Sequence, residues 1–437
     1  MTTARDDASH PRVTYVTAGG AGMFCGSCMR DNTLAATLHR RGVPITLVPT
    51  FTPIRTDEQD VSLDRVFLGG INVYLEQKIP WLRHLPHAAR RALSHPSLLR
   101  LLSKLSLQTR RREDGAIALS LLRGESGHHA GEIADLIEFI DGQLEPDVVT
   151  LTNLLISGFV PGLKKKRPVP VVVNLQGDDV FLDGLHDDDR PVVLEEMRRI
   201  AGMIDGFIVP NRAYLRFMAD LLRVPESRFH IVPLGIAEPE AYHRPEPPGD
   251  RPPTVGYLAR LCPEKGFHRL VDALLELRGL PGMEQVRLRA GGWLGASDRP
   301  FFEAQRTRLR DAGIDLEHVE SIPDRDAKVD FLAGLDVFSV PAEFLEPKGL
   351  YVLEALAAGV PVVQPDHGAF PELLASTGGG LLVPRNDPAA LATELAALLT
   401  DGARRAELGE AGRRGVSERH RAETMAETTL QVWRSLA

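Results

Sequence analysis

Short apolar runs alternate with segments in which apolar residues recur at helical spacing along the first half of the chain. The run at 12–22, RVTYVTAGGAG, ends in glycines and is followed by a helical pattern at 31–42 and a second apolar run at 43–51. Further short runs occupy 147–152, 169–177 and 206–210, with a helical pattern at 190–204 before the last. Strands that alternate with helices in this way are typical of a parallel sheet, so we predict an α/β fold here.

The second half repeats this alternation after a proline-rich stretch at 230–253, which we expect to hold no regular element. Strands are predicted at 254–260, 286–291, 337–342, 360–365 and 380–384, with helical patterns at 268–279, 328–335 and 387–402. Asp387 should cap the last of these helices, and Pro388 suits its first turn.

A chain of 437 residues is too long for one ordinary core. We therefore predict two Rossmann-like doubly wound parallel-sheet domains, residues 1–240 and 241–417, that face each other across a cleft. A C-terminal helix at about 418–437 can cross back onto the first domain.

The charge balance limits the classes of partner. The chain has 51 basic and 59 acidic residues, a formal net charge of -8, which argues against general nucleic-acid binding. No apolar run approaches the roughly 20 residues of a membrane span, and the N-terminus lacks the order of a signal peptide. Three cysteines are too few for a disulfide framework. We expect a cytoplasmic protein.

The stretch 346–363, EPKGLYVLEALAAGVPVV, carries two glutamates in an otherwise apolar element. Glu346 should lie on a loop, Gly349 should precede a helix of about three turns, and Glu354 should lie within that helix. The N-terminus of a helix presents unpaired N–H groups and binds anions such as a diphosphate. The alternative is that Glu354 is a buried helix acid paired with an arginine.

Two cations stand at the start of the second domain. Arg260 ends the predicted strand 254–260, and Lys265 opens the next helix beside Gly266. Arginine offers a planar fork and lysine a point charge, which are complementary ways to hold a diphosphate. Each residue on its own could equally be a solvated surface charge.

Together with HGAFPELL and GGGLLVPRNDPAALA further on, these motifs occur in the order found in a known family. From about residue 254 to 400 the chain resembles the GT-B glycosyltransferases, specifically the retaining family-four type, also called glycosyl transferases group 1. The resemblance implies a retaining, metal-independent transfer of a hexose from a nucleotide-diphosphate sugar to an unknown acceptor, with no cofactor. Alternatives are another GT-B activity, such as a nucleotide-sugar epimerase or phosphorylase, and a catalytically silent sugar-nucleotide binding protein.

The resemblance also implies roles for individual residues of the motif. Arg260 and Lys265 would bind the donor diphosphate and stabilise it as the leaving group, while backbone N–H groups of Gly349 and Leu350 would meet phosphate or sugar. Glu346 would hold the hydroxyls of the donor sugar, and Glu354 would accept hydrogen bonds from the ribose hydroxyls.

Lys348 departs from the family pattern, which usually has an aromatic residue at this place. It would either add a third cation at the phosphates or point into solvent.

In the first domain, the glycines that follow the first strand let the backbone approach a ligand, and the resemblance places Gly19 and Gly20 at the donor phosphates. Cys25 and Cys28 follow in CGSC. That spacing suits thioredoxin-like redox chemistry or half a zinc site, but no second Cys or His pair completes a zinc site. We predict that the pair is neither, and no metal site is expected elsewhere.

Acceptor-side candidates follow two further strands of this domain. Gln176, Asp178 and Asp179 follow the run at 169–177, where family members often carry a histidine. Asp178 could orient or help deprotonate the acceptor hydroxyl, or it could cap the following turn. Asn153 follows the run at 147–152 and is a weaker candidate.

The segment 78–112 contains nine Lys or Arg and no acid, with leucines at helical spacing. It is interpreted as a helix packed on the sheet with a basic solvated face, or as a surface for weak peripheral contact with the inner face of the membrane.

Overall fold

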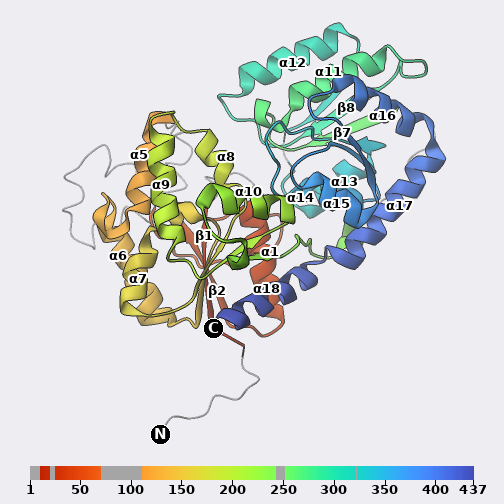
Figure 1. The fold of residues 1–437 in the computed structure, drawn as a ribbon. Coiled ribbons are helices and arrows are strands. Elements are labelled where there is room, and N and C mark those ends of the chain that lie inside the picture. The colour runs from red at the N-terminus through yellow and green to blue at the C-terminus, as the bar shows by residue number, and fades with distance from the viewer. Residues whose placement is uncertain (1–9, 20–24, 70–110, 243–250, 321) are drawn as a thin grey trace. The chain divides into compact units, whose positions relative to one another are not determined.

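The computed structural model describes residues 10–19, 25–69, 111–242, 251–320 and 322–437. They form two α/β units (Figure 1). The first comprises residues up to Val232 together with Met425–Ala437, and the second comprises Pro233–Thr424. Helix α18 (Ala422–Leu436) thus begins in the second unit and continues into the first.

The sheet of the first unit is parallel throughout, in the order β2-β1-β3-β4-β5-β6. Its strands are β1 (Val13–Ala18), β2 (Ile45–Thr50), β3 (Val148–Leu151), β4 (Val171–Asn174), β5 (Gly206–Val209) and β6 (Phe229–Ile231). The described helices are α1 (Gly26–Arg40), α5 (Arg111–Leu122), α6 (Ala130–Phe139), α7 (Val160–Lys166), α8 (Asp178–Asp183), α9 (Asp189–Ala201) and α10 (Arg212–Leu222).

Helices cover both faces of this sheet because its central strands are apolar on both faces. Along β4, Val172 packs in one core with Trp433 of α18, whereas Val171 and Val173 pack in another with Met197 of α9. All five of these side chains are fully buried. The C-terminal helix therefore completes the hydrophobic core of the first unit.

The second unit has the sheet order β12-β11-β10-β7-β8-β9, again with parallel pairs. Its strands are β7 (Thr254–Leu258), β8 (Arg287–Gly291), β9 (Asp315–Val319), β10 (Val337–Phe338), β11 (Val362–Pro365) and β12 (Gly380–Val383). Its helices are α11 (Phe267–Arg278), α12 (Arg299–Asp311), α13 (Arg325–Ala333), α14 (Leu350–Ala357), α15 (Phe370–Thr377), α16 (Pro388–Thr400) and α17 (Gly402–Arg419). The Asp387 carboxylate accepts the N–H of Ala390 and caps α16, as predicted.

The prediction that 230–253 holds no regular element was wrong at its start. β6 ends at Ile231 inside this stretch and pairs with β5, and a 3-10 turn spans Pro239–Tyr242. Pro233 lies beyond the last paired residue, so it removes no hydrogen bond from the sheet. The edge strand β9, DLEHV, was also missing from the predicted strands.

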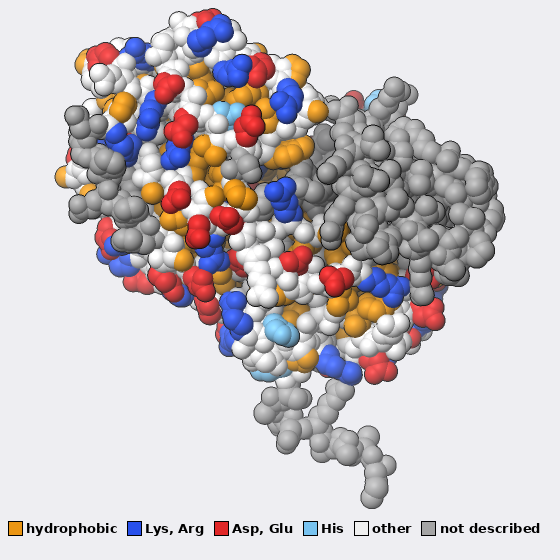
Figure 2. All heavy atoms as spheres, turned by 180° about the vertical axis from the view of Figure 1, so that it is seen from behind, with side chains coloured by type: hydrophobic (Ala, Val, Ile, Leu, Met, Phe, Trp, Pro, Cys, Tyr) orange, Lys and Arg blue, Asp and Glu red, His pale blue; other side chains and the backbone are white. Residues whose placement is uncertain are grey.

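On the face shown in Figure 2, acidic and basic side chains are interspersed and apolar side chains occur in small groups. Within the described ranges, no helix combines the length and the apolar character needed to cross a bilayer. The basic segment predicted at 78–112 lies almost wholly outside the described residues.

Candidate functional site

Gly349 sets the start of α14 in the second unit. It lies in the left-handed region with φ of 72°, and a Cβ at this position would come within 2.7 Å of Leu373 Cδ1. Glycine therefore fits here without strain, and the backbone turns sharply into the helix at Leu350. Helix α14 is eight residues long, which is shorter than the three turns that its sequence pattern predicted.

The carboxylate of Glu346 collects four hydrogen-bond donors just before this helix. Oε2 accepts from Lys265 Nζ at 2.5 Å and from the Tyr351 hydroxyl at 2.9 Å. Oε1 accepts from the backbone N–H groups of Lys348 and Gly349, both at 3.3 Å. Only 2% of Glu346 is exposed, so a residue predicted to contact a ligand is enclosed by protein donors.

Lys265 reaches Glu346 because the loops after β7 and β10 touch. Gly266 has φ of 70°, and a Cβ there would lie 1.8 Å from the carbonyl oxygen of Pro341, so no larger residue allows this approach. The ammonium lies 4.7 Å from the ring centroid of Phe344 and 5.1 Å from that of Tyr351. These aromatic faces favour a cation at this point.

Burial by itself raises the pKa of Glu346, but the charge and hydrogen bond of Lys265, the charge of Lys348 and the Tyr351 hydroxyl outweigh it and hold the pKa at about 2. The carboxylate is therefore ionised at neutral pH, and it forms a charge-assisted pair with Lys265.

Arg260 differs from Lys265 in its surroundings. It is exposed on the loop after β7, where its carbonyl oxygen accepts hydrogen bonds from the Tyr257 hydroxyl and the Cys262 N–H. Its guanidinium forms no ion pair or hydrogen bond with any residue in the described ranges. The loop is thus fixed through its backbone, while the side chain is available to a ligand.

Glu354 lies one turn and a half into α14 and is 5% exposed. Its Oε1 accepts from Lys328 Nζ of α13 at 2.7 Å, and both side chains are buried. The structure therefore places an ion pair here, with lysine rather than arginine as the partner. The two glutamates of the predicted donor site thus pair with different lysines, Glu346 with Lys265 and Glu354 with Lys328.

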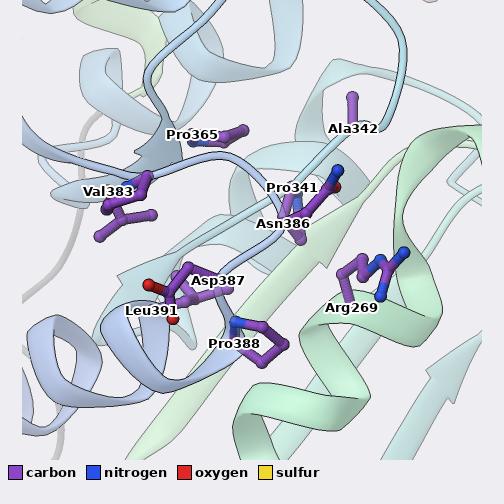
Figure 3. Close-up of a pocket in the computed structure, with 10 residues that line it drawn as sticks. Arg269, Pro341, Ala342, Pro365, Val383, Asn386, Asp387, Pro388 and Leu391 are labelled. Carbon is purple, nitrogen blue, oxygen red and sulfur yellow. The ribbon is translucent and has the colours of Figure 1, made fainter.

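A small pocket of the second unit lies at the carboxyl ends of β10, β11 and β12 (Figure 3). Arg269 stands at its rim and is tied to Glu343 through a 2.8 Å hydrogen bond. The pocket holds none of the predicted donor residues; its lining is Arg269, Pro341, Ala342, Pro365, Val383, Pro384, Asn386, Asp387, Pro388 and Leu391.

In the first unit, the glycine loop begins at Gly19, directly after β1. A Cβ on Gly19 would lie 2.1 Å from the carbonyl oxygen of Thr52, so the close approach of the two loops requires glycine. Gly20, the other predicted donor contact of this loop, lies outside the described residues.

Asp178 is turned toward backbone N–H groups at the carboxyl ends of β3 and β4. Its Oδ1 accepts from Leu154 N at 2.7 Å and its Oδ2 from Gln176 N at 3.3 Å. Burial raises its pKa to about 7, against the opposing effect of these two N–H groups. Asp178 therefore ties together the two loops that carry Asn153 and Gln176.

Asp179 and Asn153 have local partners. Asp179 accepts from the Tyr214 hydroxyl at 2.6 Å, and that hydroxyl in turn accepts the N–H of Gly177. Burial raises the pKa of Asp179 although this hydrogen bond lowers it. Asn153 accepts the N–H of Ile156 and caps the 3-10 helix at Leu154–Phe159.

Gln176 joins a buried polar network that the sequence interpretation missed. Its Nε2 donates to Asp31 Oδ1 at 3.1 Å, and Asp31 also accepts from Thr17 and from the Tyr15 hydroxyl. Because the carboxylate can only accept, the amide nitrogen must face it. Gln176 Oε1 is therefore directed elsewhere, where it is buried and has no hydrogen-bond partner among the described residues. The available signal was the adjacent charges Arg30 and Asp31 in the helix that follows the first strand.

Cys25 precedes α1 and Cys28 lies in its first turn, where the buried Cys28 thiol donates to the carbonyl oxygen of Ala18. None of the three cysteines forms a disulfide. The described residues contain no group of three or more His, Cys, Asp or Glu arranged to hold a metal ion. Asp324 is the first of two aspartates in the stretch Asp-Arg-Asp at 324–326 of the second unit. Its side chain accepts the N–H of Ala327 and caps α13.

Comparison with known proteins covers most of the chain. Residues 239–415 match the family model described as glycosyl transferases group 1, and residues 32–235 match a glycosyl transferase 4-like domain. A GDP-mannose-dependent alpha-(1-6)-phosphatidylinositol monomannoside mannosyltransferase of Mycolicibacterium smegmatis is 32% identical over 241 residues, which are 51% of this chain and 60% of that protein. A D-inositol 3-phosphate glycosyltransferase of Corynebacterium efficiens is 34% identical over 36% of this chain and 37% of its own length.

Two solved structures have a similar fold over nearly the whole chain. The Anabaena protein HepE, solved in complex with UDP and glucose, has a TM-score of 0.65 at 15% identity and covers 98% of this chain and 100% of its own. A sucrose-phosphate synthase from Thermosynechococcus elongatus has a TM-score of 0.67 at 18% identity, with coverage of 97% and 99%. At these identities the likeness establishes the predicted α/β fold with two parallel-sheet units.

Proposed function

Because this chain belongs to the group 1 glycosyl transferases, we propose that it transfers a hexose from a nucleotide-diphosphate sugar to a hydroxyl acceptor with retention of configuration. The curated relatives are matched over 60% or less of their own length, so the activity of this chain is inferred and needs a direct test. The observation that supports the proposal is the contact of Lys265 with Glu346 just before α14, with Arg260 exposed on the loop that leads to Lys265.

Each group has a role in this reaction. The ammonium of Lys265 and the exposed guanidinium of Arg260 hold the diphosphate and stabilise the charge that it gains as it leaves. The N–H groups at the start of α14 add partial positive charge on the same side. These protein cations supply the charge that a divalent metal would otherwise provide. Glu346 contacts the hydroxyls of the transferred sugar.

In the first unit, Gln176 and Asp178 serve the acceptor. Gln176 cannot take a proton. Its buried Oε1, which has no partner among the described residues, would have to turn toward the acceptor hydroxyl and orient it by accepting its hydrogen bond. Asp178 holds the loop of Gln176 through its two backbone contacts and so acts as a positioning residue. In a same-face mechanism the departing diphosphate is the base that receives the acceptor proton.

The test is product analysis with the full chain. GDP-mannose is the first donor, followed by UDP-hexoses, with inositol phosphates as first acceptors because relatives with those names share about a third of their matched residues. Transfer with an α linkage, assigned by NMR, is the expected result. Donor epimerisation or phosphorolysis would favour the other GT-B activities, and binding without any turnover would leave a silent sugar-nucleotide binding protein.

A further inference from the structure

Lys265 and the Gly349 N–H, both proposed to hold the donor diphosphate, already contact an anion, and that anion is the chain's own Glu346. Lys265 Nζ lies 2.5 Å from Oε2, and the N–H groups of Lys348 and Gly349 lie 3.3 Å from Oε1. A carboxylate and a phosphate use the same kind of donors, namely an ammonium and the backbone N–H groups at the start of a helix. Both cannot be satisfied by these donors at once.

We infer that, in the ligand-free donor site, the Glu346 carboxylate occupies the hydrogen-bond donors that bind the diphosphate. An incoming diphosphate then displaces the carboxylate from these donors. The inference rests on the proposed function, because it takes these donors to be the diphosphate site. The displaced carboxylate would leave Lys265 and the N–H groups to the phosphates and be free to turn toward the sugar attached to them.

The surroundings of Glu346 limit how the exchange can occur. Its carbonyl oxygen accepts the Ala369 N–H at 2.8 Å, and a Cβ on Gly368 would lie within 2.7 Å of both the backbone nitrogen and the carbonyl oxygen of Glu346. The Glu346 backbone is therefore held against the segment of Gly368 and Ala369, so the carboxylate has to move by side-chain rotation. Tyr351 opposes that rotation through its 2.9 Å hydrogen bond to Oε2.

A consequence is that Glu346 lowers the affinity for the diphosphate group while it supports transfer. Removing its charge should free the ammonium and the two N–H groups without changing their positions. Glu343→Gln is the matched control. It removes the same charge three residues away, where the carboxylate contacts His268 and Arg269 rather than Lys265.

The experiment is isothermal titration calorimetry of inorganic pyrophosphate and GDP into the full chain and its variants. We expect Glu346→Gln to bind pyrophosphate about tenfold or more tightly than wild type, since one charge-assisted contact no longer competes. Glu343→Gln should stay within about twofold of wild type, because only a screened long-range charge is lost.

A Glu346→Gln affinity equal to or weaker than that of Glu343→Gln overturns the inference, as does the absence of pyrophosphate binding in both wild type and Glu346→Gln. If circular dichroism shows that Glu346→Gln is unfolded, Tyr351→Phe decides. Loss of its hydroxyl should tighten pyrophosphate binding by about twofold or more, and unchanged or weaker binding refutes the inference. Tighter pyrophosphate binding without transfer to any acceptor would refute the proposed function alone.

Discussion

Lys328→Met is expected to destabilise the second unit strongly, because it removes the lysine that pairs with the buried carboxylate of Glu354. The pair has an N–O distance of 2.7 Å, and the two side chains are only 8% and 7% exposed. Removing one partner of such a pair typically costs about 3–5 kcal/mol, most of it the cost of an uncompensated buried charge. In a unit of this size 1 kcal/mol corresponds to roughly 2–4 °C in Tm, so a fall of roughly 10 °C is expected.

The double variant Lys328→Met/Glu354→Leu distinguishes the cost of an unpaired charge from the cost of replacing both side chains. Apolar replacement of both partners is often neutral, so this protein should regain most of the lost stability. Lys164→Met is the control, because Lys164 pairs with Asp205 at 2.6 Å but the two side chains are 26% and 37% exposed. That change should cost no more than about 1 kcal/mol.

Differential scanning calorimetry of the full chain measures these shifts, and titration with GDP follows on each folded variant. If Glu354 accepts the ribose hydroxyls, Glu354→Gln should weaken GDP by about 1–3 kcal/mol, the cost of unpaired buried polar groups. A Lys328→Met variant that melts within 1 °C of wild type would refute the stability argument. Unchanged GDP affinity in Glu354→Gln would show that Glu354 does not bind the ribose and has a structural role only.

Three further predictions concern other parts of the molecule. Arg260→Ala and Lys265→Ala should each weaken nucleoside-diphosphate binding by roughly 1.5–3 kcal/mol in calorimetry, and unchanged affinity in both would remove the diphosphate assignment. Because burial raises the pKa of Asp178 to about 7, the folded chain keeps a proton that the unfolded chain has lost. Stability in urea titrations should therefore fall as the pH rises from about 4 to 7, and Asp178→Asn should flatten that slope. Cys25→Ser/Cys28→Ser should leave the fold and metal content unchanged, since serine can still donate to the carbonyl oxygen of Ala18; stoichiometric zinc in the wild-type protein would contradict this.

The sequence pattern predicts the central strands well, because they are apolar on both faces and bounded by turn residues. β4 is buried at every position and stands out in the sequence. β9, in contrast, reads DLEHV and has no fully buried residue, because it pairs on one side only and forms the edge of its sheet. Its position depends on backbone hydrogen bonds to β8, which leave no periodic signal in the side chains.

The same limit applies to the candidate site. Arg260, Lys265 and Glu346 were identified by residue type and order, but Lys265 and Glu346 are 81 positions apart and their pairing depends on the fold. Tyr351 has the pattern of a core aromatic on a helix, yet its hydroxyl contacts the predicted sugar-binding acid. Lys328 lies within a helical pattern, and its burial against Glu354 follows only from the contact that the fold makes between α13 and α14.

The two cations of the donor site differ in a way that suggests an order of events. The Arg260 guanidinium is exposed and has no protein partner in the described ranges, so it can contact an approaching diphosphate at little cost. Lys265 is 16% exposed, already paired with Glu346 and enclosed by two aromatic rings, so it can bind phosphate only after that pair separates. Arg260→Ala should therefore mainly slow association, whereas Glu346→Gln should mainly slow dissociation of the diphosphate. Stopped-flow binding of a fluorescent GDP derivative distinguishes the two rates, and equal effects of both variants on association would contradict this order.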